Sequence, residues 1–146
     1  KAAFLYNFTK FITWPGARPT NEFVIGVLGN DAFADELRPL VRGRTIGGRP
    51  VRVRQMGSMA EAWQLEVLFV PAGYEDKVAG QLRQVQRAGV LTVGETAEFA
   101  ALGGVITFHR QGGKIRFAIN RASAAEAGLK ISPQLLKLAV EREASR

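Results

Sequence analysis

The side chains that could carry out catalysis are few in this sequence. Cysteine is absent, which excludes thiol nucleophiles, disulfides and cysteine-ligated metals. His109 is the single histidine, so a histidine-based metal site would need carboxylates as its other ligands, and no suitable pair lies nearby in the sequence. No G-x-S-x-G motif marks a serine nucleophile, and Ser58 has the context of a helix cap. The sequence therefore predicts a protein that is not an enzyme and needs no metal or cofactor, with His109 as a structural or surface residue.

One turn that contains two glycines could serve as a ligand site. The run Gly26-Val27-Leu28-Gly29-Asn30-Asp31 ends an apolar segment and precedes a helix pattern, which is where parallel α/β sheets bind phosphate groups. A dinucleotide-binding fingerprint has a third glycine, and that glycine is missing here. Two interpretations stay open: a plain strand-to-helix turn, and a small-ligand or nucleotide-binding α/β domain that uses this turn.

Positive charge is in excess along the chain. Lysine and arginine number 20 against 13 acidic residues, a net charge of +7 that favours acidic partners. Arg38 begins a segment without acidic residues that predicts a basic patch, formed by Arg42, Arg44, Arg49, Arg52 and Arg54. The patch is either a solvated face or a surface for an acidic protein or a lipid. Nucleic acid is not expected as a partner, because the segment has neither stacking aromatics nor a recognition helix.

Strand and helix patterns alternate along the 146 residues. Apolar runs predict buried strands at 23–28, 67–70 and 90–93, and alternation predicts a half-buried strand at 51–54. Helix patterns occupy 32–41, 74–87 and 96–102, and a hairpin joins 105–109 to 114–119 across Gln111-Gly112-Gly113. This order predicts a single domain over residues 1–146, of the α/β class: a three-layer sandwich with a mostly parallel central sheet, helices on both faces and an antiparallel C-terminal hairpin strand.

The two ends of the chain carry candidate surfaces for binding a protein. Residues 2–12 predict a helix with an unusually aromatic stripe, ended by Trp14-Pro15-Gly16. Ser132 and Pro133 predict the start of a final helix that continues to about residue 142. These apolar side chains either belong to the core or form a partner interface, where aromatic residues are enriched. The partner-binding candidates are Phe4, Phe8, Phe11, Ile131, Leu135, Leu136 and Leu138.

No apolar run in the sequence approaches the length of about eighteen residues that a membrane span needs. No signal peptide is visible either, and the sequence begins without an initiator methionine. A leader that has already been removed is compatible with this sequence.

Four segments of the sequence are similar to the YfiR-like family. They are residues 1–15 (KAAFLYNFTKFITWP), 103–108 (GGVITF), 117–120 (FAIN) and 127–139 (AGLKISPQLLKLA). Two departures stand out: some relatives have disulfide-forming cysteines that are absent here, and Pro133 stands where a second serine is common. Redox control through such disulfides is therefore not expected here, and whether another form of redox control exists stays open.

The resemblance implies a function that the residue patterns alone do not reach. It implies a periplasmic protein that dimerises and binds the periplasmic portion of a membrane-bound diguanylate cyclase. Restraint of that cyclase would lower cyclic-di-GMP signalling and biofilm formation. The resemblance also implies that the signal peptide has been removed.

Overall fold

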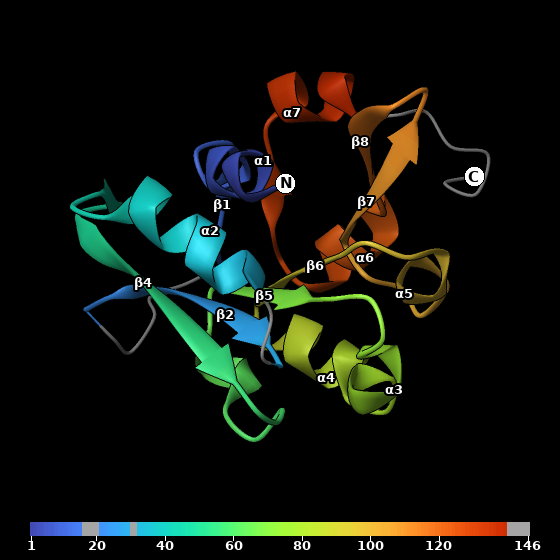
Figure 1. Ribbon diagram of the computed structural model, residues 1–146, viewed down its shortest axis with the longest axis horizontal. Helices are drawn as coiled ribbons and strands as arrows, with labels where there is room; N and C mark the ends of the chain where they lie inside the picture. The colour runs from blue at the N-terminus through green and yellow to red at the C-terminus, as the bar shows by residue number, and fades with distance from the viewer. Residues whose placement is uncertain (16–20, 30–31, 140–146) are drawn as a thin grey trace.

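A strongly curved central sheet organises the molecule (Figure 1). The computed structural model describes residues 1–15, 21–29 and 32–139. Within these residues the sheet has seven strands in the order β3-β4-β2-β5-β6-β7-β8. The strands are β2 (Phe23–Leu28), β3 (Thr45–Ile46), β4 (Arg49–Met56), β5 (Val67–Val70), β6 (Leu91–Gly94), β7 (Ile106–Gln111) and β8 (Lys114–Ile119). The five inner strands run parallel, and β3 and β8 add antiparallel edges.

Helices cover both faces of this sheet. They are α1 (Ala2–Phe8), α2 (Ala32–Val41), the 3₁₀ helix η1 (Ala62–Gln64), α3 (Glu75–Val78), α4 (Leu82–Arg87), α5 (Ala97–Ala101), α6 (Arg121–Glu126) and α7 (Pro133–Leu138). One apolar core lies between the sheet and helices α1 and α2, where Phe33 stacks on Phe69 with ring centroids 4.0 Å apart. The other lies between the opposite face and η1, α3, α4 and α5. The predicted three-layer α/β fold is therefore confirmed.

The three central strands, β2, β5 and β6, are mostly apolar because both of their faces are covered. Every residue of β2, β5 and β6 is buried, so these strands read as continuous apolar runs without alternation. The predicted hairpin is also confirmed, with β7 and β8 paired from Ile106 opposite Ile119 to Gln111 opposite Lys114.

The first predicted helix is shorter than its pattern suggested. Helix α1 ends at Phe8, and the chain continues into a short strand, β1 (Ile12–Thr13), which pairs with β9 (Lys130–Ile131) in an antiparallel ribbon. The Ser132 N–H donates to the Phe11 carbonyl at 2.8 Å and extends this pairing. Long-range hydrogen bonds thus replace the last turn that local periodicity predicted.

Two other helices differ from their predicted lengths. The helix predicted at 74–87 is divided into α3 and α4, and Gly80 lies in the break, where its low helix propensity weakens a continuous helix. Helix α7 ends at Leu138 because Ala139 is extended, with ψ 148°. The end predicted near residue 142 lies outside the described residues.

Candidate functional site

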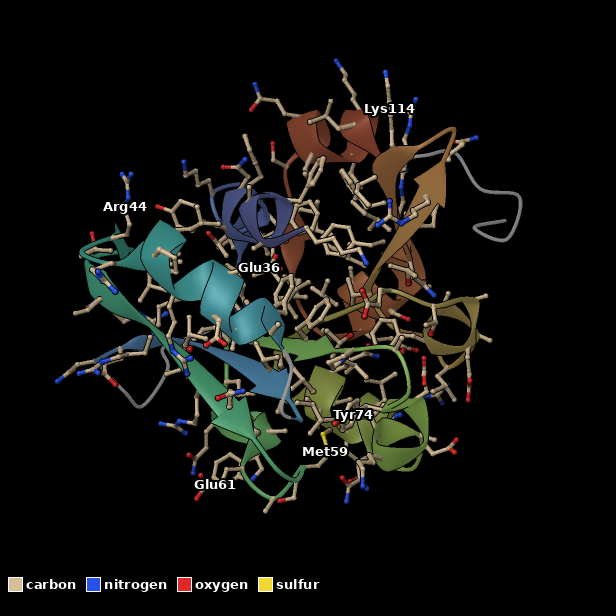
Figure 2. All side chains as sticks on the ribbon, in the orientation of Figure 1. Glu36, Arg44, Met59, Glu61, Tyr74 and Lys114 are labelled. Carbon is tan, nitrogen blue, oxygen red and sulfur yellow. The ribbon has the colours of Figure 1, made fainter. Side chains whose placement is uncertain are left out.

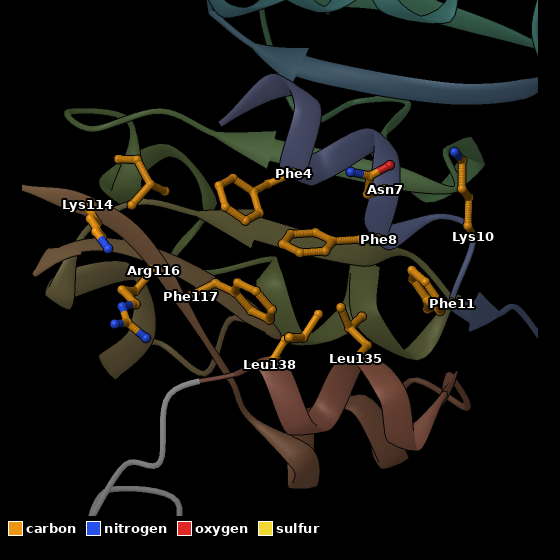
Figure 3. Close-up of a pocket in the computed structure, with 11 residues that line it drawn as sticks. Phe4, Asn7, Phe8, Lys10, Phe11, Lys114, Arg116, Phe117, Leu135 and Leu138 are labelled. Carbon is orange, nitrogen blue, oxygen red and sulfur yellow. The ribbon is translucent and has the colours of Figure 1, made fainter.

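An apolar groove of about 610 Å³ lies where α1, β8 and α7 meet. We call it the aromatic groove (Figure 3). It is lined by Phe4, Asn7, Phe8, Lys10 and Phe11 from α1 and the turn after it, by Lys114, Ile115, Arg116 and Phe117 from β8, and by Leu135 and Leu138 from α7. The aromatic groove therefore joins residues from the two ends of the sequence with the edge strand of the sheet.

Phenylalanine rings form the floor of the aromatic groove. Phe8 is buried, and its ring centroid lies 4.8 Å from that of Phe117 and 5.7 Å from that of Phe108. Phe4 packs edge-on against Phe108 at 6.1 Å, yet it keeps 38% of its surface exposed. Phe8 therefore belongs to the core, while Phe4 connects the core to the surface of the groove.

Helix α7 forms the opposite wall. The Ser132 hydroxyl accepts a hydrogen bond from the Gln134 N–H at 3.2 Å, and Pro133 occupies the first position, which suits its fixed φ. Leu135 points into the molecule and is 3% exposed, whereas Leu138, one turn later, is 66% exposed. Figure 3 shows both leucines directed from α7 toward the groove, so the helix anchors itself with the buried Leu135 and lines the open part of the groove with Leu138.

Pairing of β1 with β9 brings these two walls together. Ile12 lies opposite Ile131, so the turn after α1 is held against the segment that leads into α7. This ribbon is short, but both of its ends continue into groove-lining elements. The site therefore depends on a contact between segments about 120 residues apart in the sequence.

Cations lie at both ends of the aromatic groove. Lys114 and Arg116 stand at one end and Lys10 at the other (Figure 3). None of the lining residues is acidic. The Lys10 ammonium lies 4.9 Å from the centroid of the Tyr6 ring. The groove is thus an apolar surface inside a positively charged rim.

The predicted partner-binding residues do not all reach this groove. Phe4, Phe8, Phe11, Leu135 and Leu138 line it, although two of these five are buried. Ile131 is half-buried and lines a neighbouring, more polar depression together with Phe11. Leu136 is half-buried and packs against the core.

The sequence prediction did not include the β8 residues of the groove. Ile115 and Phe117 alternate with Lys114 and Arg116, a pattern that predicts a half-buried strand but not the neighbours of that strand.

Arg49, from the predicted basic patch, takes part in a buried ion pair. Its guanidinium lies 2.8 Å from the Glu66 carboxylate, which is fully buried, and 5.5 Å from the centroid of the Phe23 ring. The other Glu66 oxygen accepts from the Val24 N–H at 2.8 Å. These bonds connect β4, β2 and the start of β5, so Arg49 supports the sheet.

Two further arginines of the predicted patch also meet carboxylates. Arg52 pairs with Glu22 at 2.6 Å, and Arg54 lies 3.8 Å from Glu61. The remaining two, Arg42 and Arg44, are exposed, and Arg44 points away from the molecule (Figure 2). The acid-free segment of the sequence is therefore partly neutralised by acids from other elements.

The glycine turn is filled by the protein's own side chains where it is described. A side chain at Gly26 would collide with Leu65, which follows η1, and with Met56 at the end of the neighbouring strand β4. Gly29 has a φ of +85°, and the ring of Tyr74 occupies the space beside it. Asn30 and Asp31, which complete the predicted turn, lie outside the described residues. The two glycines therefore serve close packing.

The polar side chains that could take part in catalysis do not gather in one site. His109 is half-buried on β7 opposite Arg116, and Ser58 accepts a hydrogen bond from the Ala60 N–H. The Thr96 hydroxyl donates to the Glu75 carboxylate at 2.6 Å, and this bond is the main reason that the Glu75 pKa is lowered. Among the described residues, no group of three or more His, Cys, Asp or Glu side chains could hold a metal ion.

No helix in the described part of the chain combines the length and the apolar character that crossing a membrane requires.

The fold and the groove together define a three-layer α/β domain with an apolar surface site. The chain belongs to the DUF4154 family, described as YfiR/HmsC-like, whose sequence model matches residues 1–140. The resemblance found in the terminal segments is thereby confirmed. No curated protein matches the chain significantly.

Solved structures with similar folds share little sequence with this chain. A conserved domain protein from Vibrio cholerae O1 biovar El Tor superposes with a TM-score of 0.55 at 15% identity, over 80% of this chain and 53% of that protein. The ABC domain in complex with L-Trp from Streptococcus pneumoniae gives a TM-score of 0.52 at 15% identity, over 84% of this chain and 56% of that one. The chain thus spans little more than half of each, and these likenesses show the fold alone.

Proposed function

We propose that this chain is a periplasmic regulatory protein that restrains a membrane-bound diguanylate cyclase through protein–protein contact. In this role it lowers cyclic-di-GMP output and biofilm formation. Membership of the YfiR/HmsC-like family supports the proposal, because that family is one of periplasmic, non-catalytic regulators. The partner is the periplasmic portion of the cyclase or of another membrane protein.

The aromatic groove is the observation that carries this proposal. Two of the large hydrophobic side chains that the described structure leaves exposed, Phe4 and Leu138, lie in this one groove. A gathered apolar surface with a polar rim is typical of a protein interaction site, and aromatic anchors in such sites provide much of the binding energy. A partner side chain seated here would contact Phe4, Phe117 and Leu138 together.

Restraint of an enzyme by contact requires only a difference in affinity. If the chain binds the inactive conformation of the cyclase about tenfold more tightly than the active one, it shifts that equilibrium by about 1.4 kcal/mol. A shift from mostly active to mostly inactive needs a larger preference, about 5 kcal/mol. The mechanism uses no catalytic residue of this chain.

A homodimer, which the family resemblance implies, remains a prediction. Two copies that act together would present two grooves to a dimeric partner and gain affinity through effective concentration. Sedimentation equilibrium of the purified chain measures this state directly.

Capture from membranes tests the proposed partner. The purified chain is immobilised and incubated with detergent-solubilised membranes of the organism that encodes it, and bound proteins are identified by mass spectrometry. We expect a membrane protein with a diguanylate cyclase domain, retained by the wild type and lost with Phe4→Ser combined with Leu138→Ser.

Trp63→Ser is the matched control for this capture. Trp63 is 54% exposed and lies in η1, on the other face of the sheet. We call Phe4→Ser combined with Leu138→Ser the groove variant. Recovery of a cyclase by Trp63→Ser but not by the groove variant supports the proposal. Equal recovery by both variants, or no cyclase at all, contradicts it.

The alternative of a small-ligand or nucleotide-binding domain gains no support from the described turn, since Leu65, Met56 and Tyr74 fill the space around Gly26 and Gly29. A thermal-shift screen with nucleotides tests it. Stabilisation that disappears in Asn30→Ala and Asp31→Ala variants would favour the alternative.

A further inference from the structure

The aromatic groove runs along the edge of β8 rather than over one of its faces. Side chains alternate between the two faces of a strand, so a groove over one face would contact every second residue. Four consecutive residues of β8, 114–117, line this groove. Within the described chain, β8 is also the last strand of the central sheet and pairs with β7 alone. The groove therefore borders main-chain atoms as well as apolar side chains.

The register of the hairpin determines which main-chain groups face the open edge. Gly112-Gly113 has positive φ at both positions, as a two-residue type I′ turn requires. Such a turn makes Gln111 and Lys114 a hydrogen-bonded pair, and hydrogen-bonded pairs recur at every second position along the hairpin. The bond of 2.7 Å from the Asn120 N–H to the Val105 carbonyl agrees with this alternation.

Ile115 and Phe117 are consequently the residues whose main-chain N–H and C=O groups point away from β7. Lys114 and Arg116 direct theirs toward β7 and are already bonded. The open edge thus offers donor and acceptor groups at every second residue, which is the pattern that an added strand uses. The side chains of Ile115 and Phe117 face the groove, so an added strand would lie beside its aromatic floor.

Charge selects among the segments that could occupy this edge. Lys10, Lys114 and Arg116 surround the groove without an acidic neighbour in its lining, and the whole chain carries a net charge of +7. A second copy of this chain would bring the same cations together, which electrostatics disfavours. A segment that carries carboxylates gains attraction at the same positions.

We propose that the regulated partner binds by adding an extended, acidic and apolar segment to the free edge of β8. Its large apolar side chains enter the aromatic groove, on the side of Ile115 and Phe117. Its carboxylates lie on the other face, beside Lys114 and Arg116, because alternate side chains of a strand point in opposite directions. This inference rests on the proposed function, since it describes how the partner occupies the surface identified above.

A synthetic peptide tests the edge directly. The probe is a capped heptapeptide that alternates glutamate and leucine, and binding to the full chain is followed by amide hydrogen exchange in NMR spectra. On binding, exchange at the Ile115 and Phe117 amides slows about tenfold or more, because these groups become hydrogen-bonded. Exchange at Lys114 and Arg116 stays the same, because their amides are bonded before the peptide arrives.

Charge variants and a second peptide provide the controls. Lys114→Glu combined with Arg116→Glu weakens binding of the probe about tenfold or more, because attraction becomes repulsion. Arg83→Glu combined with Arg87→Glu makes the same change in charge on exposed positions of α4, and its affinity stays within about twofold of the wild type. A heptapeptide with lysine in place of glutamate does not bind.

Three results would overturn the inference: no binding of the glutamate peptide, equal binding of the lysine peptide, or protection at amides other than Ile115 and Phe117. The proposed function fails separately. If the chain captures a cyclase through Phe4 and Leu138 but these peptide results are negative, the function stands and strand addition is wrong. If the peptide binds as expected but no cyclase is captured, strand addition stands and the partner is a different protein.

Discussion

Leu135 and Leu138 lie one turn apart on the same helix and allow the accessibility of the groove to be measured. Leu135 is 3% exposed, so Leu135→Ala removes core packing and lowers the free energy of unfolding by about 2–5 kcal/mol. Leu138 is 66% exposed, so only a third of its side chain is buried, and Leu138→Ala lowers that free energy by only about 0.5–1 kcal/mol. For partner binding, Leu138 matters more than Leu135. A partner that covers the rest of Leu138 gains about 1–2 kcal/mol, so the variant binds roughly fivefold to thirtyfold more weakly.

Urea denaturation followed by tryptophan fluorescence gives the free energies of unfolding. Titration of the purified cyclase onto the immobilised chain gives the affinities. If Leu138→Ala destabilises the fold as much as Leu135→Ala does, the groove is closed in solution and the reasoning is wrong. If Leu138→Ala binds the cyclase as tightly as the wild type does, the prediction that the partner covers Leu138 is wrong.

Three further predictions concern the framework of the site. Arg49→Ala leaves the buried Glu66 carboxylate without its cation and lowers the free energy of unfolding by about 3 kcal/mol in urea titration, the lower end for a buried pair because Arg49 is 25% exposed. The lowered Glu75 pKa means that ionised Glu75 contributes stability above its unfolded pKa, and this contribution is lost as pH falls through the folded pKa. Thr96→Val removes the hydrogen bond that is the main cause of this lowered pKa, so the variant has a smaller free energy of unfolding than the wild type at neutral pH. Denaturation at a series of pH values measures this difference, which shrinks below about pH 4. Gly94→Ala places a methyl group where the ring of Phe99, from α5, already packs. It lowers the free energy of unfolding by about 1–3 kcal/mol, which is measured as a lower Tm.

Sequence patterns predicted the parts of the molecule whose signals are local. Buried strands β2, β5 and β6 were visible as apolar runs because both of their faces are covered. The cap at Ser132 and the turn at Gly112-Gly113 were visible because particular residue types meet particular backbone needs. Together these signals predicted the layers and the hairpin.

Features that depend on contacts distant in the sequence escaped prediction. Strands β1 and β9 have two residues each, too few for any periodicity, and they form because each supplies the other's hydrogen bonds. The arginines of the basic segment looked unpaired in the sequence, because the carboxylates that bind them, Glu22 and Glu66, lie in other parts of the chain. For the same reason, the aromatic stripe of α1 was visible in the sequence, while Ile115 and Phe117 as its neighbours were not.

Cyclic-di-GMP synthesis by the captured cyclase, reconstituted in lipid vesicles, tests the central claim most directly. The chain is added on the side of the periplasmic portion, and product formation from GTP is followed over time. We expect the wild type and Trp63→Ser to lower the initial rate several-fold, because a preference of about 5 kcal/mol for the inactive conformation moves a mostly active cyclase to a mostly inactive one. We expect Phe4→Ser combined with Leu138→Ser to leave the rate unchanged. A rate that the wild type does not lower, or that the groove variant lowers equally, would contradict the claim that the aromatic groove restrains the cyclase.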